Sequence, residues 1–149
     1  MRKLTALCLA IALIPLSQSY ADTRIGMIKL QSGTASISRD QETLAASPGT
    51  IVLAGDIITT GMDGAVGILF EDDTRAAIGP NSEWNLETYT YDRASKAGDA
   101  ELQLATGSLG LIAGDLIQRD PSSLRVKTPT AVIAVRGTEF AVEVLAATQ

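Results

Sequence analysis

Alternation of side-chain type with a period of two residues is the feature that most limits what this sequence can fold into. It is clearest in residues 83–91 (EWNLETYTY). One face of that segment would carry Trp84, Leu86, Thr88 and Thr90, and the opposite face Glu83, Asn85, Glu87, Tyr89 and Tyr91. Successive side chains of a strand point to opposite faces, so the pattern predicts a half-buried strand.

The same alternation recurs near the C-terminus, whereas helical spacing is hard to find. Phe140, Val142 and Val144 alternate with Glu139, Ala141 and Glu143, and Leu124 and Val126 alternate with Arg125 and Lys127. Only residues 40–47 (DQETLAAS) could form a short helix. We therefore predict an all-β fold of about ten short strands in two facing sheets. A loose repeat between residues 58–78 and 126–142 leaves two architectures open, sandwich-like or a short flattened β-solenoid.

Turn residues indicate how some of these strands connect. Asp63-Gly64 is a strong hairpin signal and Asp72-Asp73 a weaker one, and together they predict a three-strand meander over residues 56–78. The polar residues 91–101 (YDRASKAGDAE) lack apolar periodicity, so we expect a long hairpin loop there.

The middle strand of that meander would have faces of unequal bulk. Val66, Ile68 and Phe70 fall on one face, and Ala65 and Gly67 on the other. Small side chains allow close approach, so we expect a second layer to pack on the thinner face.

Residues 1–21 have the pattern of a secretory signal peptide. Arg2 and Lys3 precede an apolar run over residues 4–16, and Ser19 and Ala21 are small residues three and one before the expected cut. That run is shorter than the about 20 apolar residues that span a bilayer, and no later run is as long. We expect residues 22–149 to be a single periplasmic or secreted domain with no stable membrane insertion.

Composition excludes several kinds of site. Cys8 is the only cysteine and lies in the signal segment, and the chain has no histidine, so disulfides and Cys/His metal sites are excluded from the mature domain. We expect no cofactor. Without Arg2 and Lys3, ten basic residues face 17 acidic ones, a net charge of −7. The basic residues are scattered singly, which argues against nucleic acid as a partner.

Three segments resemble the FecR domain family. They are residues 55–61 (GDIITTG), residues 65–74 (AVGILFEDDT) and residues 128–142 (TPTAVIAVRGTEFAV), of which the last is the most specific. Asp73 stands where the family commonly has glycine. The resemblance implies an all-β periplasmic domain that binds another protein.

The resemblance also carries an expectation about signalling. In iron-uptake regulators the FecR domain follows a cytoplasmic anti-sigma segment and a membrane helix, and it contacts the signalling domain of a TonB-dependent outer-membrane receptor. A signal peptide precedes the domain here, so we expect a free-standing envelope protein that does not control a sigma factor directly. The partner would be an unidentified envelope protein.

Arg136 is the one positive charge in the most specific segment. In the family pattern Arg136-Gly137 joins two core strands, and the glycine permits a bulge or a positive φ. Arg136 would then turn inward, where a buried guanidinium needs a carboxylate. We favour Asp56 as its partner, with Glu139 second, over a ligand-binding role. The structural motif would comprise Asp56, Thr128, Pro129, Arg136, Gly137 and Thr138.

Other candidate sites carry weaker signals. Glu71, Asp72 and Asp73 could hold a cation, but their spacing is not that of a calcium loop, and we expect a solvated turn. Glu87, Tyr89 and Tyr91 could form a face for a partner or an envelope polysaccharide, which is the alternative function.

Enzymatic activity has the weakest support of the functions considered. Nucleophilic catalysis lacks its usual histidine base. A pair of carboxylates could still hydrolyse glycosides, but nothing in the sequence selects one. We therefore expect a non-enzymatic interaction module.

Overall fold

The computed structural model describes residues 24–145, which form twelve strands and one short helix. The strands are β1 (Arg24–Ser32), β2 (Ala35–Arg39), β3 (Glu42–Ala45), β4 (Ile51–Leu53), β5 (Ile57–Thr60), β6 (Ala65–Phe70), β7 (Arg75–Ile78), β8 (Glu83–Asp92), β9 (Ala97–Ile112), β10 (Leu124–Lys127), β11 (Val132–Ala134) and β12 (Glu139–Val144), and the helix is α1 (Asp115–Arg119). The expected all-β class is confirmed. No helix in the described range is long and apolar enough to cross a membrane.

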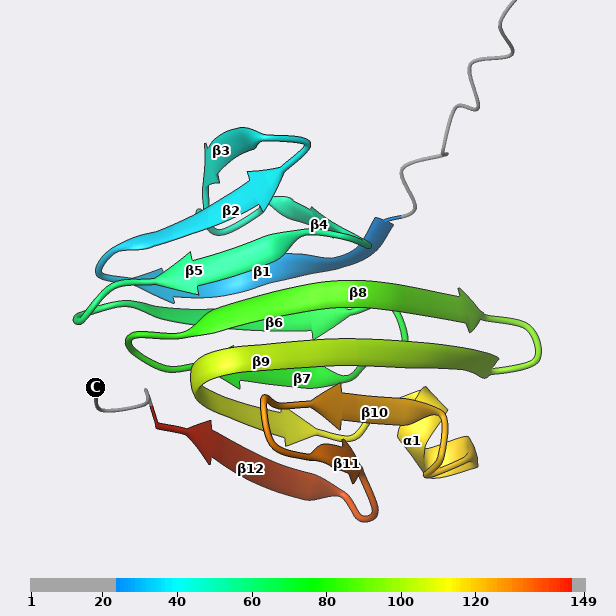
Figure 1. The fold of residues 1–149 in the computed structure, drawn as a ribbon. Helices are drawn as coiled ribbons and strands as arrows, with labels where there is room; N and C mark the ends of the chain where they lie inside the picture. The colour runs from blue at the N-terminus through cyan, green and yellow to red at the C-terminus, as the bar shows by residue number, and fades with distance from the viewer. Residues whose placement is uncertain (1–23, 146–149) are drawn as a thin grey trace, which may run out of the picture.

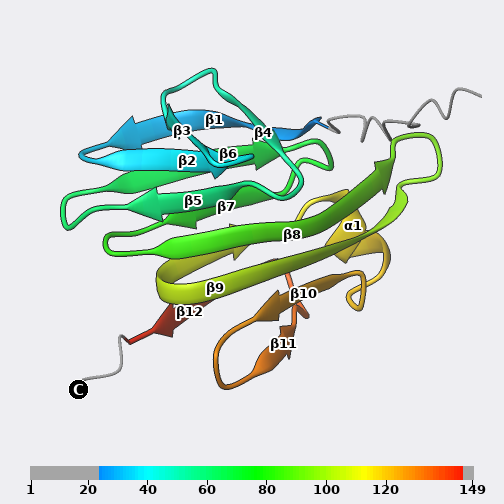
Figure 2. The same cartoon turned by 45° about the horizontal axis from the view of Figure 1, so that its top comes forward.

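The strands join into one curled, open sheet (Figure 1). Their order is β3-β2-β5-β8-β9-β7-β6-β1-β4, with β10, β11 and β12 attached beside β9 or beside each other. The first half of β9 pairs with β8 and β10, and its second half pairs with β7 and β12. Figure 2 shows β9 bending back on itself between the two halves. The expectation of two facing sheets or a solenoid is not confirmed, because β9 makes the hydrogen bonding continuous.

The core lies inside the curl, between strands that are far apart in the sheet. Phe70 of β6 meets Trp84 of β8 edge-on, with ring centroids 5.9 Å apart, and stacks on Tyr89 at 5.4 Å. β7 and β9 separate β6 from β8 in the sheet order, so these contacts cross the interior. All three aromatic side chains are buried. Burial of such large apolar surfaces stabilises the curled shape of the sheet.

One of the two predicted hairpins is present and the other is not. β6 and β7 pair across the Asp72-Asp73 turn, where Asp73 has a φ of 65°. β5 pairs with β2 and β8 instead of β6, so the predicted meander is wrong. Asp63 explains the difference, because its carboxylate accepts from the Thr34 amide at 3.1 Å and ties this turn to the β1–β2 turn. The Asp63-Gly64 turn thus leads from one half of the sheet to the other.

Two further local expectations are corrected. Residues 40–47 form no helix, because positive φ values at Asp40 and Gln41 make a tight turn that pairs β3 with β2. The long loop expected over residues 91–101 is only the short turn between β8 and β9. Gly98 permits this pairing, because a Cβ there would overlap the Thr90 carbonyl. The helix appears instead at α1.

Candidate functional site

Arg136 lies on the surface, which corrects the prediction that it is buried. Its side chain is exposed in the connection between β11 and β12, and it has no ion pair within residues 24–145. The connection runs from β11, which pairs with β10, to β12, which pairs with β9. Val135 is the buried residue in this connection. Gly137 has a φ of 118°, so the expected positive φ is confirmed. Glu139, the second proposed partner, is also exposed.

Asp56 is buried as an ion-pair partner, but its partner is Arg39. The Arg39 Nε and Nη2 atoms donate to the two carboxylate oxygens at 2.8 and 2.7 Å. The Leu53 amide donates to the same carboxylate at 2.8 Å, and Asp56 is only 1% exposed. This bidentate pair fixes the end of β2 to the turn between β4 and β5. Arg39 lies in none of the recognised motifs, so sequence reasoning missed it.

Thr128, Pro129 and Thr138 shape turns between strands. The Thr128 hydroxyl accepts from the Ala131 amide at 3.0 Å, which closes the turn between β10 and β11 around the exposed Pro129. The Thr138 carbonyl accepts from the Ala113 amide at 2.8 Å, just before β12. The structure therefore spreads the proposed motif residues over separate turns.

Glu87, Tyr89 and Tyr91 do not form the proposed face, because a bulge in β8 reverses which side chains point inward. The β8–β9 register shifts between Asn85 and Thr88. An extra residue at such a bulge reverses which side chains face inward. Tyr89 is therefore buried, and Tyr91 is half-buried. Glu87 remains at the surface, where Lys127 donates to it at 3.1 Å.

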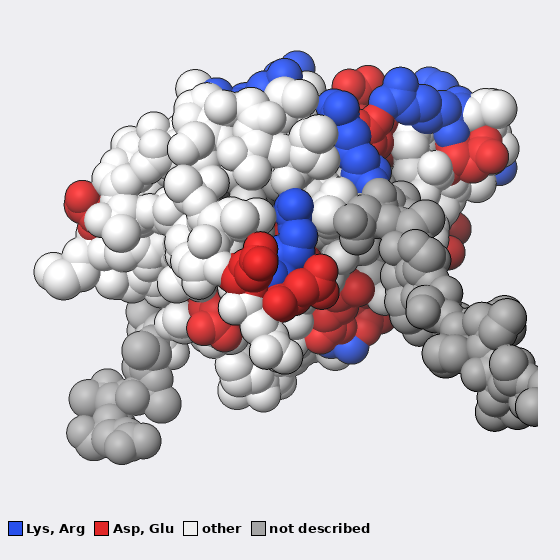
Figure 3. All heavy atoms as spheres, turned by 90° about the horizontal axis from the view of Figure 1, so that it is seen from above, with Lys and Arg blue, Asp and Glu red and all other residues white. Residues whose placement is uncertain are grey.

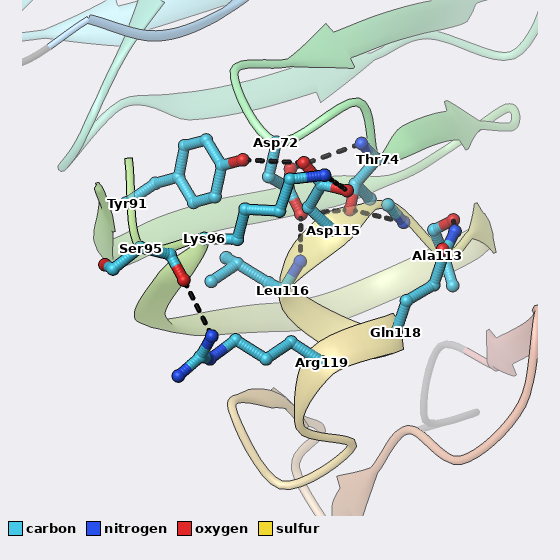
Figure 4. Close-up of polar contacts among 11 residues, drawn as sticks. Asp72, Thr74, Tyr91, Ser95, Lys96, Ala113, Asp115, Leu116, Gln118 and Arg119 are labelled. Atoms are coloured by element: carbon cyan, nitrogen blue, oxygen red, sulfur yellow. Dashed lines mark hydrogen bonds and ion pairs between the residues drawn. The ribbon is translucent and has the colours of Figure 1, made fainter. Parts of the chain in front are cut away.

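Asp72 is the centre of a buried polar cluster that the sequence did not indicate (Figure 4). Its carboxylate accepts from the hydroxyls of Tyr89 and Thr74, each at 2.7 Å, and from the Leu116 amide at 3.3 Å. The Asp72 carbonyl accepts from the Asp115 amide at 2.7 Å. These bonds hold the start of α1 against the β6–β7 turn. Asp72 is fully buried, so the cluster has no access to a substrate.

The surroundings of this cluster raise the pKa values of Tyr89 and Tyr91. Burial, followed by the charge and hydrogen bond of Asp72, raises the pKa of Tyr89. The hydrogen bond to Asp115, at 2.8 Å, raises the pKa of Tyr91 to about 12. Both hydroxyls therefore remain protonated donors at neutral pH.

The turn of Glu71, Asp72 and Asp73, expected to be solvated, is exposed only at Asp73. Asp72 points inward, whereas Glu71 forms ion pairs with Arg24, at 2.7 Å, and with Arg93. Within the described chain no cluster of His, Cys, Asp or Glu residues could hold a metal ion. The side of the molecule seen in Figure 3 carries small groups of both charge signs beside a wide uncharged area.

The outer face of β1, β6, β7, β9 and β12 carries an open groove of about 430 Å³. One residue from each strand lies in a row across its floor: Leu30, Gly67, Ala77, Gly110 and Ala141. Leu69 and Ile112 stand beside that row. Leu30 and Ile112 are 72% and 46% exposed. We call this surface the outer-face groove.

The outer-face groove corrects the expectation for the thin face of residues 65–70. Val66, Ile68 and Phe70 share one face as predicted, and that face is buried in the core. Ala65 and Gly67 face outward, and no second layer from residues 24–145 covers them. The thin face is therefore open to solvent.

Charged side chains stand at the borders of the outer-face groove. Lys29 and Arg75 line it, and neither has a carboxylate partner within the described residues. Glu139 lines its other end on β12 and is likewise without an ion pair there. The groove thus has an apolar floor and charges of both signs at its border.

A comparison with protein families identifies the chain. The model described as FecR protein matches residues 56–148. The chain belongs to the FecR family. The match begins at the buried Asp56 and includes β6, β7, β9 and β12, four of the strands that form the outer-face groove of this FecR domain. No curated protein and no solved structure matches the chain.

Proposed function

We propose that this FecR domain is a non-enzymatic interaction module of the bacterial cell envelope, with another envelope protein as its partner. Membership of the FecR family supports a role in sensing or signalling. The outer-face groove is the observation that carries the proposal. Contiguous exposed apolar surfaces on soluble domains commonly mark contact sites for other macromolecules.

A periplasmic or secreted location is part of the same proposal. The support is the signal-peptide pattern of residues 1–21, which lie outside the described residues. An envelope location would bring the groove into contact with other envelope proteins.

The partner's surface would be apolar with carboxylates at its border. Leu30, Leu69 and Ile112 provide the apolar contacts. Lys29 and Arg75, which lack carboxylate partners within residues 24–145, would receive acidic side chains from the partner. Charges at the rim of an interface mainly direct its specificity and association rate.

The polar cluster gives no support to enzymatic activity. The Asp72 carboxylate is surrounded by protein donors and has no exposed surface. A general acid or base must come within hydrogen-bond reach of its substrate. The polysaccharide alternative also loses its basis, because Tyr89 is buried.

A pull-down from periplasmic extract tests the proposal, with Leu30→Asp as the test variant. Leu30 is 72% exposed in the groove, so the substitution should leave the fold intact and abolish partner capture. Met62→Asp is the matched control, because Met62 is 85% exposed on the β5–β6 turn outside the groove. Equal capture by the wild type and the Leu30→Asp variant, or no capture at all, would contradict the proposal.

A further inference from the structure

The geometry of β12 points to a second contact, which rests on the proposed function. We infer that β12 binds an extended segment of the partner as an added antiparallel strand. That segment carries basic side chains alternating with apolar ones. Its main-chain groups supply affinity and its side chains supply specificity, as in other cases of strand addition.

β12 is the longest of the strands at the ends of the described sheet. It pairs only with β9, and their register runs without a shift from Glu139 to Val144. The other end strands, β3, β4 and β11, have four, three and three residues, whereas β12 has six. β12 also lacks the proline, lysine or bulge with which proteins commonly blunt an edge.

The hydrogen-bonding direction of each β12 residue follows from the first bond of the ladder. The Thr138 carbonyl accepts from the Ala113 amide of the β9 side at 2.8 Å. Main-chain groups of successive residues alternate in direction in an antiparallel pair. Glu139, Ala141 and Glu143 therefore present their amide and carbonyl groups to the open side.

The same residues give the open edge a negative outer face. Glu139 and Glu143 are exposed, and neither has an ion pair within residues 24–145. Their cross-strand neighbours on β9 are the uncharged Ile112 and Ser108. Opposite charges directly across a strand pair are stabilising. Basic side chains on an added strand would complete both pairs.

The inner face of β12 requires apolar partners. Phe140, Val142 and Val144 are half-buried and pack against the core. Alternate side chains of an added strand would lie beside them and extend that surface. The added segment therefore carries basic residues opposite Glu139 and Glu143, and apolar residues opposite Phe140, Val142 and Val144. Because Glu139 and Ala141 also line the outer-face groove, the added strand would border the groove directly.

A second copy of β12 fits this edge poorly. Side chains that face each other across a strand pair lie on the same side of the sheet. Two β12 strands would therefore bring Glu139 and Glu143 of each copy together without any basic residue between them. Like charges across a pair are destabilising, which favours a basic segment of another protein.

Binding of synthetic peptides to the purified chain tests whether the added strand must be basic and must alternate basic with apolar residues. The probe is a labelled peptide of about eight residues in which lysine alternates with valine, slightly longer than the six-residue β12 that it would pair with. We expect it to bind, and the same peptide with glutamate for lysine to bind at least tenfold more weakly. The double variant Glu139→Lys/Glu143→Lys should reverse this preference. Glu42→Lys on the edge strand β3 is the control and should not change it.

N-methylated peptides separate strand addition from simple charge attraction. Methylation of the lysine amides, which would face β12, should abolish binding, whereas methylation of the valine amides should not. Equal effects of the two patterns, no binding of the lysine peptide, or dimerisation of the chain through β12 would overturn the inference. The Leu30→Asp variant should still bind the peptide, so failure at the edge is distinguishable from failure of the outer-face groove as a docking site.

Discussion

At the scale of single residues, the ion pair of Asp56 shows where sequence reasoning stops. Asp56 was correctly expected to be a buried carboxylate with an arginine partner. Its partner is Arg39, 17 residues earlier, and Arg136 is exposed. An apolar run around an arginine does not tell whether its side chain points inward, because that depends on strands elsewhere in the chain.

Substitution of the two arginines separates these roles. Arg39→Ala leaves the Asp56 carboxylate buried without its cation, which should lower the free energy of unfolding by roughly 3 kcal/mol. Arg136→Ala removes an exposed side chain and should change it by less than about 0.5 kcal/mol. Urea denaturation measures both. A larger loss for Arg136→Ala than for Arg39→Ala would show that the buried pair is assigned wrongly.

Tyr89 shows a second limit at this scale. Period-two alternation predicted the inward side of Trp84 and Leu86 correctly, and both are buried. The register shift between Asn85 and Thr88 then places Tyr89 inside with them. A bulge adds one residue without a composition signal, so the sequence could not indicate which tyrosine would be buried.

At the scale of elements, turn residues predicted one hairpin correctly and missed the strand pairings that depend on distant contacts. The Asp72-Asp73 turn joins neighbouring strands, and the sequence alone identified it. The bend of β9 depends on a turn elsewhere in the chain, because Gly107, with a φ of 92°, lies against Ser82 between β7 and β8. A Cβ at Gly107 would overlap both the Oγ and the Cα of Ser82. The continuity of the curled sheet therefore relies on this glycine.

Alanine substitutions at Gly107 and Gly137 separate the cost of steric overlap from the cost of a positive φ. Gly107→Ala combines a positive φ with overlap and should lower the free energy of unfolding by at least about 2 kcal/mol. Gly137→Ala has a φ of 118° but nothing within 4 Å, and should cost about 1 kcal/mol. Thermal denaturation of the two variants checks the order. Equal costs would mean that the bend of β9 tolerates a side chain.

The hydrogen bonds that link Asp115 of α1 to Tyr91 and Lys96 should make the stability of the fold depend on pH. Tyr91 and Lys96 both donate to Asp115, and these bonds lower the pKa of its carboxyl group. Asp115 therefore stabilises the fold fully above the ordinary carboxyl pKa of about 3.9, and this contribution disappears as pH falls through the lowered value.

Asp115→Asn is the variant that isolates this contribution. The melting temperature of the wild type should exceed that of Asp115→Asn at pH 7, and the difference should shrink as pH falls below about 4. Other carboxyl groups also titrate in this range, so the difference between the two proteins is the relevant quantity. A difference that stays constant down to pH 2 would contradict the assignment.

At the scale of the whole molecule, the all-β class followed from alternation, whereas the open groove did not. Ala65 and Gly67 correctly marked a thin face, and we expected another layer of the same chain to cover it. The sheet curls the other way and leaves that face to solvent. The direction of curling is set by which long-range pairs form around β9. No local pattern in the sequence encodes that choice.

The central claim is that the outer-face groove contacts another envelope protein. Site-specific photo-crosslinking in cells tests it most directly, with a photoreactive residue replacing Ile112 in the groove or Met62 outside it, both of which are exposed. We predict a crosslinked partner from position 112 and none from position 62. Crosslinking from position 62 alone, or from neither position, would contradict the account.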